Sequence, residues 1–198
     1  MDSLRLFAAV LLTDELLDGI TAFQYTAAKT IPPSLVKWIP RDNLHLTLQF
    51  LGDTPEDRVP DVLTAMQRAA GMLCSNAAGS RGPTLATTTA GAFPSLHRPR
   101  VLWLGLQGDT AALVDLNRAL RHELSEVDLR YDPKPFRPHI TIAYVRKGRA
   151  PGELGVIVTT LPEVEPPRRS MRVDAIHLVA SDLRPDGAHY RTVGSTAL

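Results

Sequence analysis

Two short stretches of this chain pair a histidine with a threonine two residues later. They read His45-Leu46-Thr47 and His139-Ile140-Thr141, and no other histidine in the sequence has a threonine at that spacing. An imidazole is the side chain that exchanges a proton most readily near neutral pH. A hydroxyl beside it can donate a hydrogen bond to an anion. The residue types therefore indicate acid–base chemistry at a negatively charged group.

Phosphate is the anion that suits two such pairs best. One neutral histidine can take a proton from water while the other, protonated, gives a proton to a leaving oxygen. The two threonine hydroxyls can stabilise the charge that develops on the phosphate oxygens. The arrangement suits the hydrolysis of a cyclic phosphodiester, and it needs neither a metal nor a cofactor.

Three other interpretations of the histidines stay open at this stage. A histidine on a strand can be a hydrogen-bonded structural residue, and threonine is a common strand residue. Histidine is also the commonest metal ligand, although no Asp, Glu or Cys lies at a strong ligand spacing around either pair. A non-catalytic module could hold a nucleotide with the same groups.

Both pairs lie in segments with the alternation of a half-buried β-strand. In the first segment, strict alternation places Leu44, Leu46, Leu48 and Phe50 on an apolar face and His45, Thr47 and Gln49 on a polar face. In the second, His139 and Thr141 share one face, and Ile140, Ile142 and Tyr144 share the other. Each apolar face needs a core, so each polar face should look outward.

The rest of the chain alternates between strand-like and helix-like segments in a mixed order. Helical spacing of apolar residues appears over about 14–29, 55–74 and 110–126, and residues 155–161 fit either a strand or a weak helix. This order predicts an α+β fold with antiparallel sheets covered by helices. One histidine segment in each half of the chain suggests an internal duplication with pseudo-twofold symmetry. A polar loop is expected over 76–82 and a turn over 184–187.

Composition narrows the class of protein. The formal net charge is +1, which gives no support to tight, sequence-independent nucleic-acid binding. The single Cys74 cannot form an internal disulfide and fits a reducing compartment. No apolar run of about 18 residues is present, so we expect no membrane span. We expect a cytoplasmic, monomeric protein.

The two motifs, in the sequences HLTLQFLG and PHITIAYV, resemble the signatures of the two-histidine phosphoesterase superfamily, and most closely the RNA 2′,3′-cyclic phosphodiesterases, also called 2′–5′ RNA ligases. The resemblance extends over nearly the whole chain. Further matching segments are 5–7, 37–40, 43–44, 93–94, 98–103, 136–138 and 181–183, with Gly187 and Tyr190.

This resemblance implies a single bilobed domain over 1–198, with two antiparallel sheets, helices on the outside and the active groove between the lobes. It implies metal-independent hydrolysis of a 2′,3′-cyclic phosphate, on an RNA end or a nucleotide, to a 2′-phosphate. His45, in one lobe, would be the proton donor, and His139, in the other, the proton acceptor. Thr47 and Thr141 would hold the phosphate. Ligation of RNA ends through a 2′–5′ bond is the reverse reaction and uses the same groups.

One position departs from the family pattern. Relatives often carry Arg directly after the Ala of the second motif, where this chain has Tyr144. Strict alternation places neither residue 144 nor residue 146 on the face of His139, so the departure concerns substrate affinity and not the acid–base pair. The residues that we consider for substrate binding are Phe7, Arg98, Arg100, Arg137 and Tyr144. For the three arginines, a solvated structural role is an equal alternative.

Overall fold

The computed structural model describes residues 2–76, 82–185 and 187–198. Its elements are β1 (Ser3–Leu11), α1 (Asp14–Ala28), β2 (Val36–Trp38), β3 (His45–Pro55), α2 (Val59–Asn76), β4 (Thr84–Phe93), β5 (Val101–Gly108), α3 (Thr110–Glu126), β6 (His139–Val145), α4 (Gly155–Glu163), β7 (Ser170–Arg172), β8 (Ala175–Arg184) and β9 (Gly187–Ala197). The predicted α+β class is confirmed, and the segment that starts at Gly155 is a helix. Most of the loop expected over 76–82, and Asp186 in the expected last turn, lie outside the described residues.

The strands pair antiparallel in the order β7-β4-β5-β6-β3-β1-β8-β9. Strand β2 pairs with β6 on the side of β6 that faces away from β5. We call β3, β1, β8 and β9 the β3 half, and β6, β5, β4, β7 and β2 the β6 half. The two histidine segments therefore form the two central strands, one in each half. Four strands of the continuous path lie on each side of the junction, as the expected pseudo-twofold arrangement requires.

The expectation of two separate sheets needs a correction. The two halves are joined into one hydrogen-bonded path by a single residue pair, Leu46 with Ile140. Strands twist, and two strongly curled halves diverge on either side of their crossing point. The result is one curled sheet whose halves touch only at the two motifs.

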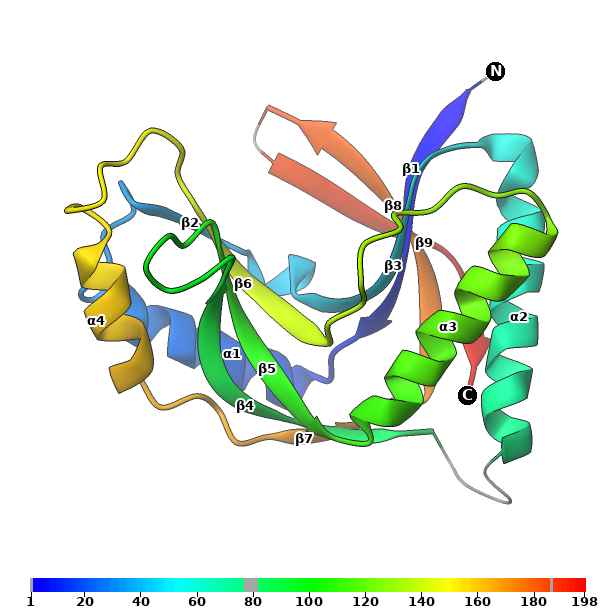
Figure 1. Ribbon diagram of the computed structural model, residues 1–198, viewed down its shortest axis with the longest axis horizontal. Coiled ribbons are helices and arrows are strands. Elements are labelled where there is room, and N and C mark those ends of the chain that lie inside the picture. The colour runs from blue at the N-terminus through cyan, green and yellow to red at the C-terminus, as the bar shows by residue number, and fades with distance from the viewer. Residues whose placement is uncertain (1, 77–81, 186) are drawn as a thin grey trace.

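Each half carries two helices (Figure 1). Helices α2 and α3 pack against each other and against β9 and β3 in the β3 half. Helices α1 and α4 lie beside the β6 half, where Gln24 of α1 donates a hydrogen bond to the carbonyl of Ile142 in β6 at 2.9 Å. No helix within the described residues has the length and apolar character needed to cross a membrane.

One apolar core lies between the helices and the sheet and continues under both halves. Leu46 and Ile140 are 1% and 0% exposed and belong to this core. The residues before and after them in the strands therefore point to the opposite, outward face of the sheet.

Candidate active site

The junction of β3 and β6 brings together the four residues predicted to be catalytic. Leu46 is the central residue of the first motif and Ile140 that of the second, and these two residues are paired. In an antiparallel pair, the residue before one partner lies across from the residue after the other. His45 therefore faces Thr141, and Thr47 faces His139, on the outward side of the sheet.

The His45 imidazole is fixed through both of its nitrogens. Nδ1 donates to the carbonyl of Asn43 at 2.7 Å, since a carbonyl can only accept, and Nε2 lies 2.9 Å from the Thr47 hydroxyl. Two aromatic rings from other strands pack on the imidazole: Phe7 of β1 at 4.9 Å and Tyr190 of β9 at 5.3 Å between ring centres. In the neutral imidazole, Nε2 accepts the hydrogen of Thr47.

His139 is held in the same way from the other half. Its Nδ1 donates to the carbonyl of Arg137 at 2.6 Å, which is again the residue two positions earlier. Phe93 of β4 stands edge-on to the ring at 5.0 Å, and Trp103 of β5 packs on Phe93 at 5.2 Å. With Nδ1 occupied, Nε2 is the nitrogen left for proton exchange.

Burial lowers the pKa of both imidazoles below the ordinary value, because the charged form loses hydration. The backbone carbonyls of Asn43 and Arg137 act in the opposite sense and raise each pKa. The pKa of His45 is lowered further by the charge of His139, which places the two rings within electrostatic reach of each other. Two histidines that repel each other's charge favour the state in which only one is protonated.

A β-bulge in β3 changes which side chains join the outward face. On β1, Ala8 and Ala9 are adjacent, but their partners on β3 are Gln49 and Thr47, so Leu48 is an extra residue. The prediction that Gln49 shares the face of His45 is therefore wrong: Gln49 is 3% exposed, and Phe50 is 48% exposed. The bulge reverses the alternation, so Phe50 joins the outward face.

The same irregularity occurs at the equivalent place in β6. Leu102 and Trp103 of β5 pair with Ala143 and Thr141, which makes Ile142 the extra residue. Tyr144 is consequently 50% exposed, so the expectation that it lies on the face opposite His139 is wrong. Tyr144 acts electrostatically on Tyr190, which places it near the His45 end of the site. Each motif thus presents His, Thr and an aromatic ring five residues after the His.

A cavity of about 400 Å³ opens beside His139 and Thr47. Its wall is formed by β3, β4, α3 and the chain leading into β6, with the lining side chains Thr47, Leu48, Gln49, Phe50, Phe93, Arg121, Asp132, Lys134, Pro135, Phe136, Arg137 and His139. Arg137 also lies over the Phe93 ring, with 6.0 Å between guanidinium carbon and ring centre. Aromatic rings with a Lys and an Arg beside a phosphate-sized site suit a nucleotide.

The five residues considered for substrate binding have different positions. Phe7 and Tyr144 are at the His45 end and Arg137 is in the cavity at the His139 end. Arg98 and Arg100 are exposed in the loop after β4 and line neither of the two cavities described here. The loop that carries those two arginines is held by backbone hydrogen bonds, including Arg100 N to the Phe93 carbonyl at 2.8 Å.

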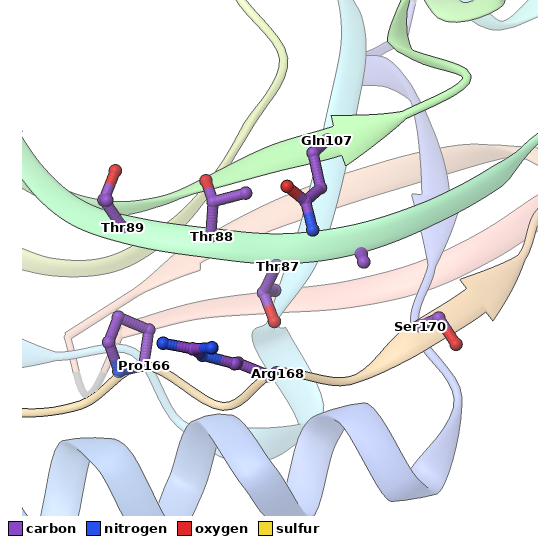
Figure 2. A pocket seen from close by; sticks show the side chains of 8 residues that line it. Thr87, Thr88, Thr89, Gln107, Pro166, Arg168 and Ser170 are labelled. Atoms are coloured by element: carbon purple, nitrogen blue, oxygen red, sulfur yellow. The ribbon is translucent and has the colours of Figure 1, made fainter.

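A second cavity, of about 390 Å³, lies between β4 and the chain that leads into β7 (Figure 2). Its side chains are small hydroxyl and amide groups around Arg168: Thr87, Thr88, Thr89, Gln107 and Ser170. None of the four predicted catalytic residues lines it. Arg168 is itself paired with Glu165 at 3.5 Å, so the cavity offers no unpaired cation.

Sequence reasoning missed several residues that touch the site. Tyr190, Phe93 and Phe50 contact the histidines or line the cavity, but their faces depend on strand pairings and bulges that no local pattern reveals. Lys134 and Phe136 had a signal, because the proline-rich stretch before the second motif indicated an ordered approach to His139. Within the described residues, no group of three or more His, Cys, Asp or Glu side chains is arranged to hold a metal.

Comparison with known proteins identifies relatives of this chain. Residues 14–185 match the family described as the 2'-5' RNA ligase superfamily. A protein of Methanothermobacter thermautotrophicus named RNA 2',3'-cyclic phosphodiesterase is 30% identical over 94% of this chain and 94% of its own length. A Thermus thermophilus protein of the same name is 33% identical over 98% of this chain and 90% of its own. A third, from Geobacillus stearothermophilus, is 34% identical over 73% of this chain, but the match spans 43% of that protein.

Solved structures share the fold. The crystal structure of TT0787 from Thermus thermophilus superimposes with a TM-score of 0.73 at 30% identity, covering 98% of this chain and 97% of that one. The Escherichia coli protein LigT, crystallised with 3'-AMP, gives a TM-score of 0.73 at 27% identity, covering 100% and 99% of the two chains.

Proposed function

This chain belongs to the 2'-5' RNA ligase superfamily, and from that premise we propose that it hydrolyses a 2′,3′-cyclic phosphate, on an RNA end or a nucleotide, to a 2′-phosphate. The observation that carries the proposal is the single pair between Leu46 and Ile140, because it sets the two His-x-Thr motifs across from each other. The named relatives support the general activity.

In the proposed mechanism, His139 is the proton acceptor. Its Nε2 takes a proton from a water molecule whose oxygen attacks phosphorus, since the Nδ1 hydrogen is held by the Arg137 carbonyl. His45 is the proton donor. As the bond from phosphorus to O3′ breaks, the protonated His45 gives its Nε2 hydrogen to O3′, and the phosphate stays on O2′.

Thr47 and Thr141 hold the phosphate in this mechanism. Each hydroxyl lies across from the histidine of the other motif, so each can donate to a non-bridging oxygen whose charge grows in the transition state. All of these groups belong to the protein, and the proposed mechanism uses no metal.

The assay that tests this proposal uses adenosine 2′,3′-cyclic phosphate and identifies the product. We expect adenosine 2′-phosphate, at a rate that EDTA does not change. A 3′-phosphate product would reverse the proposed bond cleavage, and inhibition by EDTA that added metal restores would contradict the metal-free mechanism.

The same experiment separates the enzyme from a non-catalytic nucleotide-binding module. The observation favouring the enzyme is that both Nδ1 atoms are held by a carbonyl two residues earlier, which makes Nε2 of each ring the atom for proton transfer. Saturable binding without turnover would select the module. Adding an RNA with a free 5′-hydroxyl tests the ligation direction, in which that hydroxyl replaces water as the attacking group.

A further inference from the structure

The β3 bulge turns the side chain of Gln49 into the protein, where all of its hydrogen-bonding groups are used. Its Nε2 donates to the carbonyls of Phe50 at 3.0 Å and Asp132 at 2.8 Å. Its Oε1 accepts from Asn117 Nδ2 at 3.1 Å and from Arg121 Nε at 2.6 Å, both on α3. A buried amide with every group satisfied holds its neighbours in one arrangement.

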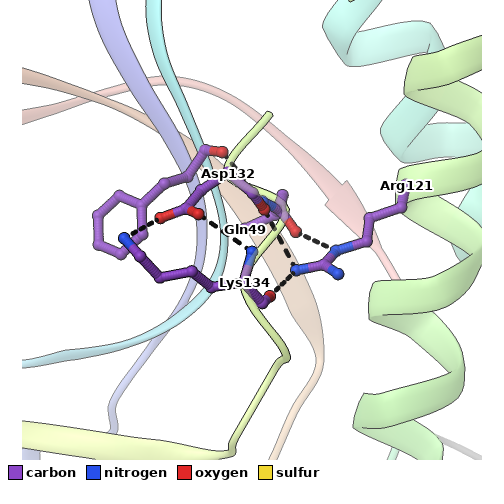
Figure 3. A network of polar contacts seen from close by, with 5 residues as sticks. Gln49, Arg121, Asp132 and Lys134 are labelled. Atoms are coloured by element: carbon purple, nitrogen blue, oxygen red, sulfur yellow. Dashed lines mark hydrogen bonds and ion pairs between the residues drawn. The ribbon is translucent and has the colours of Figure 1, made fainter. Parts of the chain in front are cut away.

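Arg121 extends this network to the chain that leads into β6 (Figure 3). Its second guanidinium nitrogen donates to the carbonyls of Asp132, at 3.3 Å, and Lys134. Asp132 N in turn donates to the Phe50 carbonyl at 2.9 Å. The planar guanidinium thus ties α3, Gln49 and two carbonyls of the 132–138 segment together.

The 132–138 segment has no regular secondary structure, and it passes from the β3 half to the β6 half. It contains Pro133, Pro135 and Pro138, which restrict its backbone. Near its end, the carbonyl of Arg137 accepts a hydrogen bond from Nδ1 of His139 at 2.6 Å. Five residues of this segment, Asp132 and 134–137, also line the 400 Å³ cavity.

We propose that Gln49 and Arg121 are positioning residues for His139, because they fix the segment whose Arg137 carbonyl holds Nδ1 of the imidazole. The proposal rests on the proposed function, in which His139 is the base. Gln49 follows the first motif by two residues, so the network also couples the strand of one histidine to the orientation of the other. A loosened segment would leave the imidazole free to rotate and to lose its preferred tautomer.

The groups around His139 make its pKa a suitable reporter. The charged or titratable groups that face it are His45 across the strand pair and Arg137 on its own segment, with Lys134, Asp132 and Arg121 lining the same cavity. The strands beside it, β4 and β5, present Phe93 and Trp103. The hydrogen bond to the Arg137 carbonyl raises the pKa of His139, so its loss should lower that pKa.

The test compares Arg121→Met and Gln49→Leu with Arg118→Met, which removes an exposed arginine of the same helix that pairs with Asp115. In the first two variants we expect kcat for adenosine 2′,3′-cyclic phosphate to fall about 10- to 100-fold. We expect the pKa of His139, measured by NMR titration without substrate, to fall in both variants. Arg118→Met should leave both quantities at the wild-type value.

The direction of the pKa change separates positioning from a simple charge effect. Removing the positive charge of Arg121 would by itself raise the pKa of a nearby histidine, whereas loss of the Arg137 hydrogen bond lowers it. Arg121→Lys, which keeps the charge and can reach one carbonyl, should recover part of kcat. The exposed His97, in the loop after β4, serves as the internal reference in each spectrum.

Two results would overturn the inference. One is a variant that unfolds more easily but keeps the wild-type kcat and the wild-type His139 pKa, which would make the network purely structural. The other is a His139 pKa that rises in Arg121→Met and stays at the wild-type value in Gln49→Leu. That result would be the effect of the lost charge alone. If the wild-type protein does not turn over the cyclic phosphate, the proposed function fails instead, and the NMR titration still decides whether the network positions His139.

Discussion

At the scale of single residues, the two histidines are alike in their tethering and different in their surroundings. Each gives its Nδ1 hydrogen to a carbonyl two positions earlier, but His45 is enclosed by Phe7 and Tyr190, whereas His139 borders the cavity with Arg137 and Lys134. This difference fits a division of roles, because water reaches His139 through the cavity. Residue types and spacing were enough to predict four catalytic residues, since the chemistry of a side chain depends on its type. Their surroundings come from four other strands and could not be predicted.

The first prediction concerns the two imidazoles. A catalytic acid or base contributes roughly 10²–10⁴-fold to the rate, so His45→Ala and His139→Ala should each lower kcat for adenosine 2′,3′-cyclic phosphate by about that factor. The control is His97→Ala, because His97 is an exposed histidine in the loop after β4. This variant should retain wild-type kcat. A His139→Ala enzyme with full activity would remove the proposed base.

The second prediction concerns acid stability. Burial lowers the pKa of His45 and His139 in the folded protein. Below the histidine pKa of the unfolded chain, about 6.5, the unfolded chain therefore binds more protons than the folded protein does. The stabilisation is fully present above that pH and is lost as the pH falls toward the folded-state values. The free energy of unfolding, from urea titrations between pH 7.5 and 5, should therefore decrease. The decrease should be smaller in the His45→Gln, His139→Gln double variant, and an equally steep decrease there would assign the acid sensitivity to other groups.

At the scale of elements, alternation predicted the two motif strands and their inward faces as far as the threonines. It failed directly after them, because both strands carry an extra residue at the same distance from the histidine. A bulge is set by pairing with a neighbouring strand, so it leaves no signal in an isolated segment. The consequence is functional: Phe50 and Tyr144 become half-exposed rings beside the site, and Gln49 becomes buried.

The third prediction compares these two rings. With His45 as the proton donor to O3′, the ribose lies toward the His45 end, where Tyr144, Tyr190 and Phe7 gather. Stacking on an aromatic ring contributes about 1–3 kcal/mol per base. Tyr144→Ala should therefore raise KM for adenosine 2′,3′-cyclic phosphate by roughly 5- to 100-fold, and Phe50→Ala by less. The opposite order of the two KM values would place the nucleoside in the cavity beside His139 and exchange the proposed acid and base.

At the scale of the whole molecule, the two halves share little hydrogen bonding but one core. The β3–β6 junction is a single residue pair, whereas the apolar cluster that includes Leu46 and Ile140 continues under both halves. We propose that 1–198 is one domain for this reason. A site that requires one motif from each half gains from such a core, because rigid packing keeps the histidines in register while the outward face stays open.

The fourth prediction tests this unity through the junction. Both tryptophans, Trp38 and Trp103, belong to the β6 half, so their fluorescence reports that half, whereas circular dichroism also records α2 and α3 in the β3 half. Ile140→Ala removes a fully buried side chain and should lower the free energy of unfolding by about 2–5 kcal/mol. If the core makes the halves cooperative, the two probes give the same urea midpoint in the wild type and shift together in the variant. The contrary result is an Ile140→Ala variant whose fluorescence midpoint falls while the circular-dichroism signal of α2 and α3 persists, which would show that the β6 half unfolds alone. In that case, the matched variant Leu46→Ala should lose the circular-dichroism signal of α2 and α3 before the fluorescence changes.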